Sequence, residues 1–432
     1  MTFGEITSDQ TGGAFTQSSP QPEVFQSLTR DVWFLLASRA TRLFAYGALS
    51  VVLVLYLNDT GLSEPQIGAL LTLTLIGDVV ISLYLTTRAD RLGRRRTLVF
   101  GSLLMITAGA AFSVTREFWL LLIAGTIGVI SPSGNEVGPF LPIEQAALAE
   151  VIHDRVRTHV FAWYTLTGAF ATAIGSLVGG LLPSATTSGP LSYRPVILLY
   201  ASLGVLLAFL FSYLSPAVEA LKRPVGSSVT SSPKSFLGIH RSKNIVLKLS
   251  ALFALDAFGG GFVVQSFAAF WFHLRFGADA STLGSIFFGA NVLAGVSALV
   301  AARLARRFGL VKTMVFTHLP SNVLLILVPL MPTLPLAVVL LFARFSISQM
   351  DVPTRQSYMM AVVSPDERSA AAGISGVART VGASIAPVFV GLLFAHPSLL
   401  NLPFFIGGIL KVVYDLLLYR GFVAVRPPEE TT

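Results

Sequence analysis

Apolar residues occur along the chain in long runs that short polar segments separate. A bilayer core of about 30 Å is crossed by roughly 20 apolar residues in helical form. Turn residues such as Asn58-Asp59 and Met331-Pro332 mark the breaks between runs. Twelve runs are long enough, at 32–57, 67–87, 97–114, 118–149, 158–183, 195–214, 246–273, 281–302, 311–331, 335–362, 370–394 and 401–420. The pattern predicts an all-α integral membrane protein of twelve transmembrane helices.

The twelve runs form two sets of six that repeat each other in sequence. Asp90-Arg91-Leu92-Gly93-Arg94 follows the second run, and Arg306-Arg307-Phe308-Gly309 follows the eighth. Pro142-Ile143-Glu144-Gln145 in the fourth run likewise matches Pro353-Thr354-Arg355-Gln356 in the tenth. Parallel repeats of this kind place a solute path at the interface of the two halves. The predicted organisation is a disordered tail (1–28), an N-terminal six-helix bundle (29–214), a linker (215–245), a C-terminal six-helix bundle (246–421) and a second tail (422–432).

Lys and Arg outnumber Asp and Glu by 30 to 22, which gives a formal net charge of +8. Most of the basic residues stand in the polar segments after even-numbered runs, as the positive-inside rule requires of cytoplasmic loops. This distribution explains the positive charge without nucleic acid as a partner. We therefore expect both termini and the linker to be cytoplasmic, and the plasma membrane to be the location.

Composition excludes several kinds of chemistry. Only 12% of the residues are charged and 53% are hydrophobic, whereas soluble proteins carry about 25% charged residues. The chain has no cysteine, so disulfides, thiolate metal sites and cysteine nucleophiles are absent. The six histidines are expected mainly in loops or at helix ends, with no His–carboxylate cluster. With no nucleotide-binding Gly-Lys-Ser/Thr loop either, neither an enzyme nor a primary pump is indicated, and no cofactor or metal is expected.

The segment from Ala89 to Arg96 carries a resemblance to a known family. It has an acidic residue, a basic residue, a glycine and a basic pair between two apolar runs, and it resembles the cytoplasmic signature of the major facilitator superfamily. One departure is Thr86, because the family usually has glycine at that position. The resemblance implies two six-helix repeats that alternate access to a central cavity, which helices 1, 4, 7 and 10 line.

We expect the signature to act as a gate. Gly93 permits a tight turn, and Asp90 is predicted to bind an arginine or a helix N-terminus of the other half when the cytoplasmic side is closed. Glu144 and Arg355 occupy equivalent repeat positions with opposite charge, and they are predicted to pair across the pseudo-two-fold axis. The predicted gate residues are Asp90, Arg91, Gly93, Arg94, Glu144 and Arg355.

Polar residues inside the apolar runs are candidates for the transport path, because a charge at mid-bilayer costs several kcal/mol unless it faces a cavity or a partner. Pro132, Gly134 and Gly138 predict a break in the fourth helix. Arg39 has an alternative interpretation, in which its side chain extends to the headgroups. Lys411 and Asp415 are predicted to pair with each other on helix 12. The predicted cavity residues are Arg39, Arg42, Tyr46, Asp78, Asn135, Glu136, Asp256, Gln265, Arg344, Asp351 and Arg379.

The sequence therefore predicts a secondary transporter of small solutes, coupled to protons through Asp78, Glu136, Asp256 or Asp351. Export of small organic compounds is the first hypothesis. The alternative is proton-coupled import of an anionic nutrient, suggested by Arg39, Arg42 and Arg344. A non-transporting receptor on the same scaffold is a third. The expected partners are a small-molecule substrate, H+ and the lipid bilayer, and a monomer is expected.

Overall fold

The computed structural model describes residues 29–152, 154–184, 192–219, 239–364 and 367–425. The predicted tail 1–28 lies outside them, as do residues 220–238 of the predicted linker and residues 426–432 of the second tail. Every regular element of the described residues is a helix. The helices of the first half are α2 (Arg30–Asp59), α3 (Glu64–Leu92), α4 (Arg94–Val114), α5 (Phe118–Ile127), α6 (Phe140–Val151), α7 (Asp154–Ser184), α8 (Arg194–Ser212) and the short η2 (Pro216–Val218). Those of the second half are α9 (Lys243–Gly261), α10 (Gln265–Phe276), α11 (Ala280–Phe308), α12 (Leu310–Leu327), η3 (Val328–Leu330), α13 (Leu334–Ser348), α14 (Asp351–Val362), α15 (Arg368–Phe394), η5 (Pro397–Leu399) and α16 (Leu402–Phe422).

The predicted helical membrane class is confirmed. Among the described residues, eleven helical segments are long and apolar enough to cross a membrane. The remaining predicted span, the fourth, consists of α5 and α6 with the irregular segment 128–139 between them. Spans seven and ten are also divided, into α9 with α10 and α13 with α14. Helix ends differ from the predicted ones by a few residues; α4, for example, begins at Arg94 rather than at position 97.

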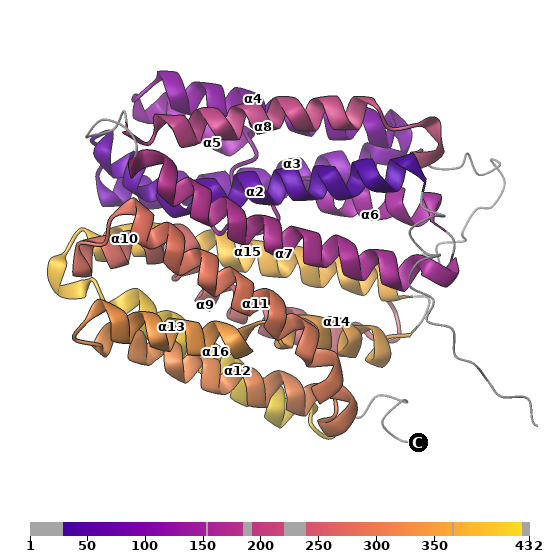
Figure 1. Cartoon of the computed structure of the whole chain (residues 1–432). Coiled ribbons are helices and arrows are strands. Elements are labelled where there is room, and N and C mark those ends of the chain that lie inside the picture. The colour runs from indigo at the N-terminus through magenta and orange to yellow at the C-terminus, as the bar shows by residue number, and fades with distance from the viewer. Residues whose placement is uncertain (1–28, 153, 185–191, 220–238, 365–366, 426–432) are drawn as a thin grey trace, which may run out of the picture.

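The repeat is visible in the turns that join spans two and three, and spans eight and nine. Gly93 separates α3 from α4 with φ 99°, and Gly309 separates α11 from α12 with φ 86°. Side chains with a Cβ rarely adopt this conformation, so glycine is needed at both turns. We call the end of the molecule that holds these two arginine-rich turns the basic end, and the other the opposite end. In Figure 1 the basic end is on the right, where α11 finishes, and α10 lies at the opposite end.

Each half packs mainly within itself. In the first half α2 lies against α7 and α8, and α4 against α8; in the second half α9 lies against α15 and α16, and α12 against α16. The halves meet where α7 packs on α11, α3 on α15 and α2 on α10 (Figure 1). Spans two, five, eight and eleven thus form most of the interface between the halves.

The closest contacts between the halves are at the opposite end. There Gly180 of α7 lies against Gly284 of α11, and Gly68 of α3 against Gly391 of α15, so closely that a Cβ on Gly68 would be 2.6 Å from the carbonyl oxygen of Pro387. Nearer the basic end, a Cβ on Gly376 of α15 would meet no atom within 4 Å. The halves are therefore closed against each other at the opposite end.

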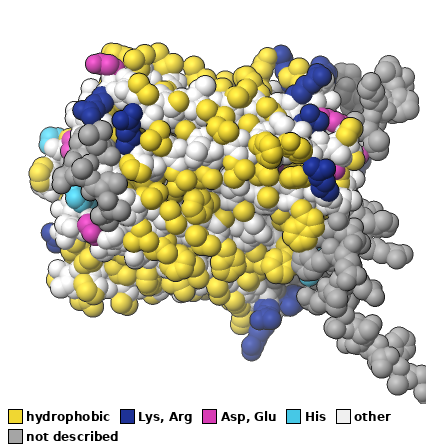
Figure 2. All heavy atoms as spheres, turned by 45° about the horizontal axis from the view of Figure 1, so that its top comes forward, with side chains coloured by type: hydrophobic (Ala, Val, Ile, Leu, Met, Phe, Trp, Pro, Cys, Tyr) yellow, Lys and Arg dark blue, Asp and Glu magenta, His cyan; other side chains and the backbone are white. Residues whose placement is uncertain are grey.

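The outer surface fits a lipid environment. Large apolar side chains such as Val80, Trp119 and Phe209 are more than half exposed along the spans. Figure 2 shows hydrophobic side chains over the middle of the face in view, with charged side chains toward the two ends. In water such a surface would be strongly unfavourable, whereas acyl chains cover it without cost.

Candidate functional site

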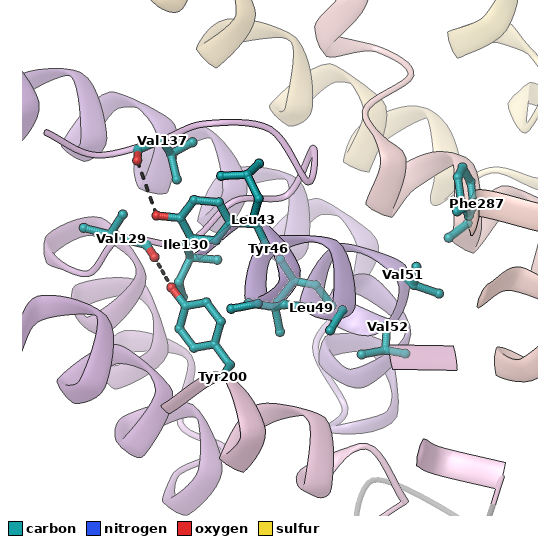
Figure 3. Close-up of a cluster of buried hydrophobic side chains, with 14 of the residues drawn as sticks. Leu43, Tyr46, Leu49, Val51, Val52, Val129, Ile130, Val137, Tyr200 and Phe287 are labelled. Carbon is teal, nitrogen blue, oxygen red and sulfur yellow. Dashed lines mark hydrogen bonds between the residues drawn. The ribbon is translucent and has the colours of Figure 1, made fainter. Parts of the chain in front are cut away.

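The break in span four is held open by polar side chains from neighbouring spans. The Tyr46 hydroxyl donates to the carbonyl of Val137 at 3.4 Å, and the Tyr200 hydroxyl donates to the carbonyl of Val129 (Figure 3). The Asp78 carboxylate accepts the backbone N–H of Gly138 at 2.6 Å. These bonds satisfy backbone groups that a continuous helix would have paired internally.

Tyr46 and Asp78 are both predicted to line the cavity, but their side chains bind backbone groups of the break in span four. Tyr46 is fully buried in an apolar cluster with Leu43, Leu49 and Ile130 (Figure 3), where it supports the broken span. Asp78 is also buried, and within the described part of the chain it accepts hydrogen bonds from Gly138 and Ser82, neither of which is basic. The predicted break itself is present, and Asn135 within it is exposed.

The break brings Glu136 against two arginines of α2. Arg42 donates to Glu136 at 2.6 Å and to Glu144 at 2.6 and 2.8 Å, and Arg39 forms a second ion pair with Glu136. Ser38 and Tyr164 also donate to Glu144. We call Arg39, Arg42, Glu136 and Glu144 the first-half ion cluster. Its two cations and two anions balance, and Arg42 and Glu144 are completely buried.

A matching cluster lies in the second half. Asp256 of α9 accepts hydrogen bonds from Lys411 of α16 at 2.6 Å and from Arg355 of α14 at 3.2 Å. Arg355 also donates to Asp351 at 2.9 Å. We call Asp256, Asp351, Arg355 and Lys411 the second-half ion cluster. It too has two cations and two anions, and each residue is less than a tenth exposed.

Beside this cluster lies a histidine–aspartate pair that the sequence did not predict. His318 lies in the middle of α12, and its side chain is buried. Its Nδ1 is 2.9 Å from Asp415 of α16, and its Nε2 is 3.7 Å from Asp256. Asn322 donates to the other oxygen of Asp415 at 2.9 Å. The predicted pairing of Lys411 with Asp415 is wrong, because the two side chains bind partners on other helices. The expectation that the chain has no His–carboxylate cluster fails at His318, which lies between Asp415 and Asp256.

Gln265 joins the halves rather than lining an open space. At the start of α10 it donates to Ser50 of α2 at 2.8 Å and to Ser176 of α7 at 3.1 Å. The next residue, Ser266, donates to the carbonyl of Pro132 at 2.6 Å. The break between α9 and α10 therefore binds the broken span four across the interface.

Two arginines predicted in the cavity have no acidic partner. No ion pair or side-chain hydrogen bond is found for Arg344 of α13 or Arg379 of α15 within the described part of the chain, and the Nε of each is buried and unbonded. Both guanidinium groups interact electrostatically with Asp256 and Asp351. They therefore belong to the same interior region as the second-half ion cluster, which is already balanced without them.

The predicted gate residues make their contacts within one half. Asp90 binds Arg94 one turn away at 2.8 Å, and Arg94 reaches the carbonyl of Val218 at 3.1 Å. Arg91 is exposed. In this structure the predicted contact of Asp90 with the other half is not formed among the described residues.

The predicted pair of Glu144 with Arg355 is wrong for this conformation. Glu144 binds Arg42 and Arg355 binds Asp256 and Asp351, so each is neutralised inside its own half. Equivalent positions in two parallel repeats are displaced to opposite sides of the pseudo-two-fold axis. Equivalence in the repeat therefore does not bring them into contact.

Two six-helix repeats, an apolar outer surface and buried charges in both halves are the features of a multi-pass membrane transporter. The family model of the Major Facilitator Superfamily matches residues 35–348 and 249–432, which together cover nearly the whole chain. The chain belongs to this superfamily, whose members are transporters and not enzymes.

Relatives of the whole chain agree with this assignment. An uncharacterised membrane protein of Saccharomyces cerevisiae is 30% identical over 94% of this chain and 97% of its own length. Multidrug resistance protein 1 of Bacillus subtilis is 22% identical over 82% of this chain and 86% of its own. Among solved structures, a mutant form of the nucleoside transporter NupG has the same fold, with a TM-score of 0.73 and 15% identity over 91% of this chain and 100% of its own.

Proposed function

We propose that the protein is a proton-coupled secondary transporter that exports small organic compounds. The observation that carries the proposal is the contact of Asp256 with Lys411, a carboxylate–ammonium pair buried inside the second half. A buried ion pair is stable only while both partners are charged and bonded. Protonation of Asp256 removes its attraction for Lys411 and Arg355, so proton binding there changes the contacts that hold α9, α14 and α16 together.

The same region offers a route for the proton. His318 lies between Asp256 and Asp415, at 3.7 and 2.9 Å, and its imidazole can take up and release a proton near neutral pH. The first-half ion cluster is the counterpart on the other side of the interface. Movement of the halves between two conformations then exposes these carboxylates to one side of the membrane at a time.

Export is favoured over import by two considerations. The Bacillus subtilis relative is named a multidrug resistance protein, and export of compounds is one way in which a membrane transporter can give such resistance. The import hypothesis depended on Arg39, Arg42 and Arg344 as an anion site, and two of these arginines are bound to Glu136 and Glu144. Of these three arginines, Arg344 is the one that still supports an anionic cargo.

Transport into liposomes tests the proposal. The purified full chain is reconstituted with a pH-sensitive dye trapped inside, and proton movement is recorded after addition of ethidium, a cation, or carboxyfluorescein, an anion. We expect compound-dependent proton movement that Asp256→Asn abolishes. Asp59→Asn is the matched control, because Asp59 is an exposed carboxylate at the opposite end. Proton movement that persists in Asp256→Asn would contradict the coupling role.

We also propose that the basic end faces the cytoplasm of the plasma membrane and that the protein acts as a monomer. The positive-inside rule supports the orientation. The chain contains no cysteine, so a single introduced cysteine gives an unambiguous label. Arg306→Cys in intact cells should resist a membrane-impermeant maleimide, and Thr333→Cys should react with it.

A further inference from the structure

We propose that Arg344 and Arg379 form the recognition site for the anionic group of the substrate, an organic compound that bears a carboxylate or a phosphate. This assignment rests on the proposed transport function and specifies the class of its cargo. Nothing in the coupling role of Asp256 requires it.

The first step of the argument is the charge balance of the interior. The first-half ion cluster has two arginines and two glutamates, and the second-half ion cluster has two aspartates with Arg355 and Lys411. Each cluster is neutral by itself. Arg344 and Arg379 add two positive charges to this interior, and the remaining acid nearby, Asp415, is bound by His318 and Asn322.

The second step is the cost of an unpaired guanidinium. Arginine stays protonated in proteins, and a charge inside the membrane is expensive unless it has a partner or faces water. The Nε atoms of Arg344 and Arg379 are buried with no hydrogen-bond partner, although the side chains as wholes are partly exposed. Such a cationic side chain has hydrogen-bond donors that no protein group satisfies and that are left for a ligand.

The third step is position. Arg344 lies one turn before the end of α13 at Ser348, where span ten breaks, and Arg379 lies near the middle of α15. Asp351, at the start of α14, stands seven positions after Arg344 along the same span, so a ligand on Arg344 lies on the span that carries part of the second-half ion cluster. The buried Ser348 hydroxyl has no hydrogen-bond partner either, and it adds a donor on the same helix.

The fourth step is the chemistry of the ligand. The guanidinium group presents a planar fork of donors that matches the two oxygens of a carboxylate or phosphate group. Phe345 supports the group at Arg344, whose guanidinium carbon lies 5.0 Å from the ring centroid. An anion bound to these arginines would neutralise excess positive charge in the second half.

Anion-dependent thermal stability of the purified full chain tests the assignment. The probes are benzoate and phenyl phosphate, which share one ring and differ in the anionic group, with neutral benzamide as the uncharged analogue. We expect at least one of the two anions, and not benzamide, to raise the melting temperature. Arg344→Gln and Arg379→Gln should each lose that increase, while Arg306→Gln, which removes the same charge from an exposed position on the basic turn, should keep it.

A second measurement does not depend on the choice of ligand. Without added anion, Arg344→Gln and Arg379→Gln should melt at or above the temperature of the wild type, since each removes an unpaired charge. Arg355→Gln, which breaks a paired one, should melt lower. Equal stabilisation of wild type and both variants by the anions, absence of any anion effect on the wild type, or destabilisation of both variants without ligand would each overturn the assignment. If the wild type shows compound-dependent proton movement but no stabilisation by the anions, this assignment fails and the proposed function stands. If the anions stabilise the wild type but no proton movement is seen, the proposed function fails and the anion site stands.

Discussion

The ammonium group of Lys411 lies 2.6 Å from a carboxylate oxygen of Asp256, and this contact joins span twelve to span seven inside the second half. Gly259 and Gly260 of α9 lie against the side chain of Lys411. A Cβ on Gly260 would be 3.5 Å from the Nζ of Lys411, and one on Gly259 would be 3.2 Å from its Cγ. Gly259 thus lets α16 approach α9 closely, since a Cβ there would also be 3.0 Å from the carbonyl oxygen of Gly407.

Replacement of Lys411 by Met should destabilise the protein strongly. Removal of one partner of a buried ion pair leaves an uncompensated charge and typically costs about 3–5 kcal/mol. The double variant Asp256→Asn with Lys411→Met should recover most of that loss, because neither charge remains. Thermal unfolding in detergent, compared across the two single variants and the double variant, measures this coupling.

Lys248→Met is the control for this experiment. Lys248 stands on α9 as Asp256 does, but its side chain is exposed. Its replacement should change the unfolding free energy by less than about 1 kcal/mol. An equal loss in Lys248→Met and Lys411→Met would show that the Asp256 contact has no special weight.

Sequence alone could predict the spans, the repeat and the break in span four, because these depend on local composition. It could not predict the partners of the buried charges. Lys411 and Asp415 have the spacing of an intrahelical pair, yet their partners come from α9 and α12. Tyr46 follows Arg42 at helical spacing, but the face it shares meets the broken span four instead of open space. Which helix a given face meets is decided by packing between distant segments, and the spacing of residues holds no information on it.

Glu367 should give the protein a pH dependence in the acid range. Burial raises the pKa of Glu367, but the backbone N–H groups of Arg241, His240 and Ser242 lower it more, and together they hold it at about 2. The pKa in an unfolded chain is about 4.3. The stabilisation is therefore complete above that value and is lost as the pH falls toward 2.

Glu367→Gln should accordingly melt below the wild type at pH 7, and the two melting temperatures should converge between about pH 4.5 and pH 2. Melting curves at pH 7, 4.5 and 3 provide the comparison. A difference that stays constant over this range would mean that the carboxylate charge is not what holds residues 240–242.

Asp90→Asn should separate stability from transport. In this conformation Asp90 is mostly exposed, and its ion pair among the described residues is with Arg94, so its loss should cost less than about 1 kcal/mol. If Asp90 closes the basic end in the other conformation, the transport rate should fall while the melting temperature is unchanged. Asp59→Asn, at the opposite end, should alter neither, and normal transport in Asp90→Asn would exclude the latch.

Gly391→Ala should shift the protein away from the conformation described above. A Cβ on Gly391 would meet the Cα of Gly68 at 2.9 Å, and the backbone of α3 cannot give way without moving the first half. Gly376→Ala is the matched control on the same helix, because a Cβ there meets nothing within 4 Å and alanine also favours the helix. Since the chain has no cysteine, spin labels at Thr115→Cys and Thr333→Cys can report the separation of the halves at the opposite end. Gly391→Ala should lengthen that separation and lower transport, whereas Gly376→Ala should leave both unchanged. An unchanged separation in Gly391→Ala would mean that the contact of α3 with α15 does not control closure at this end.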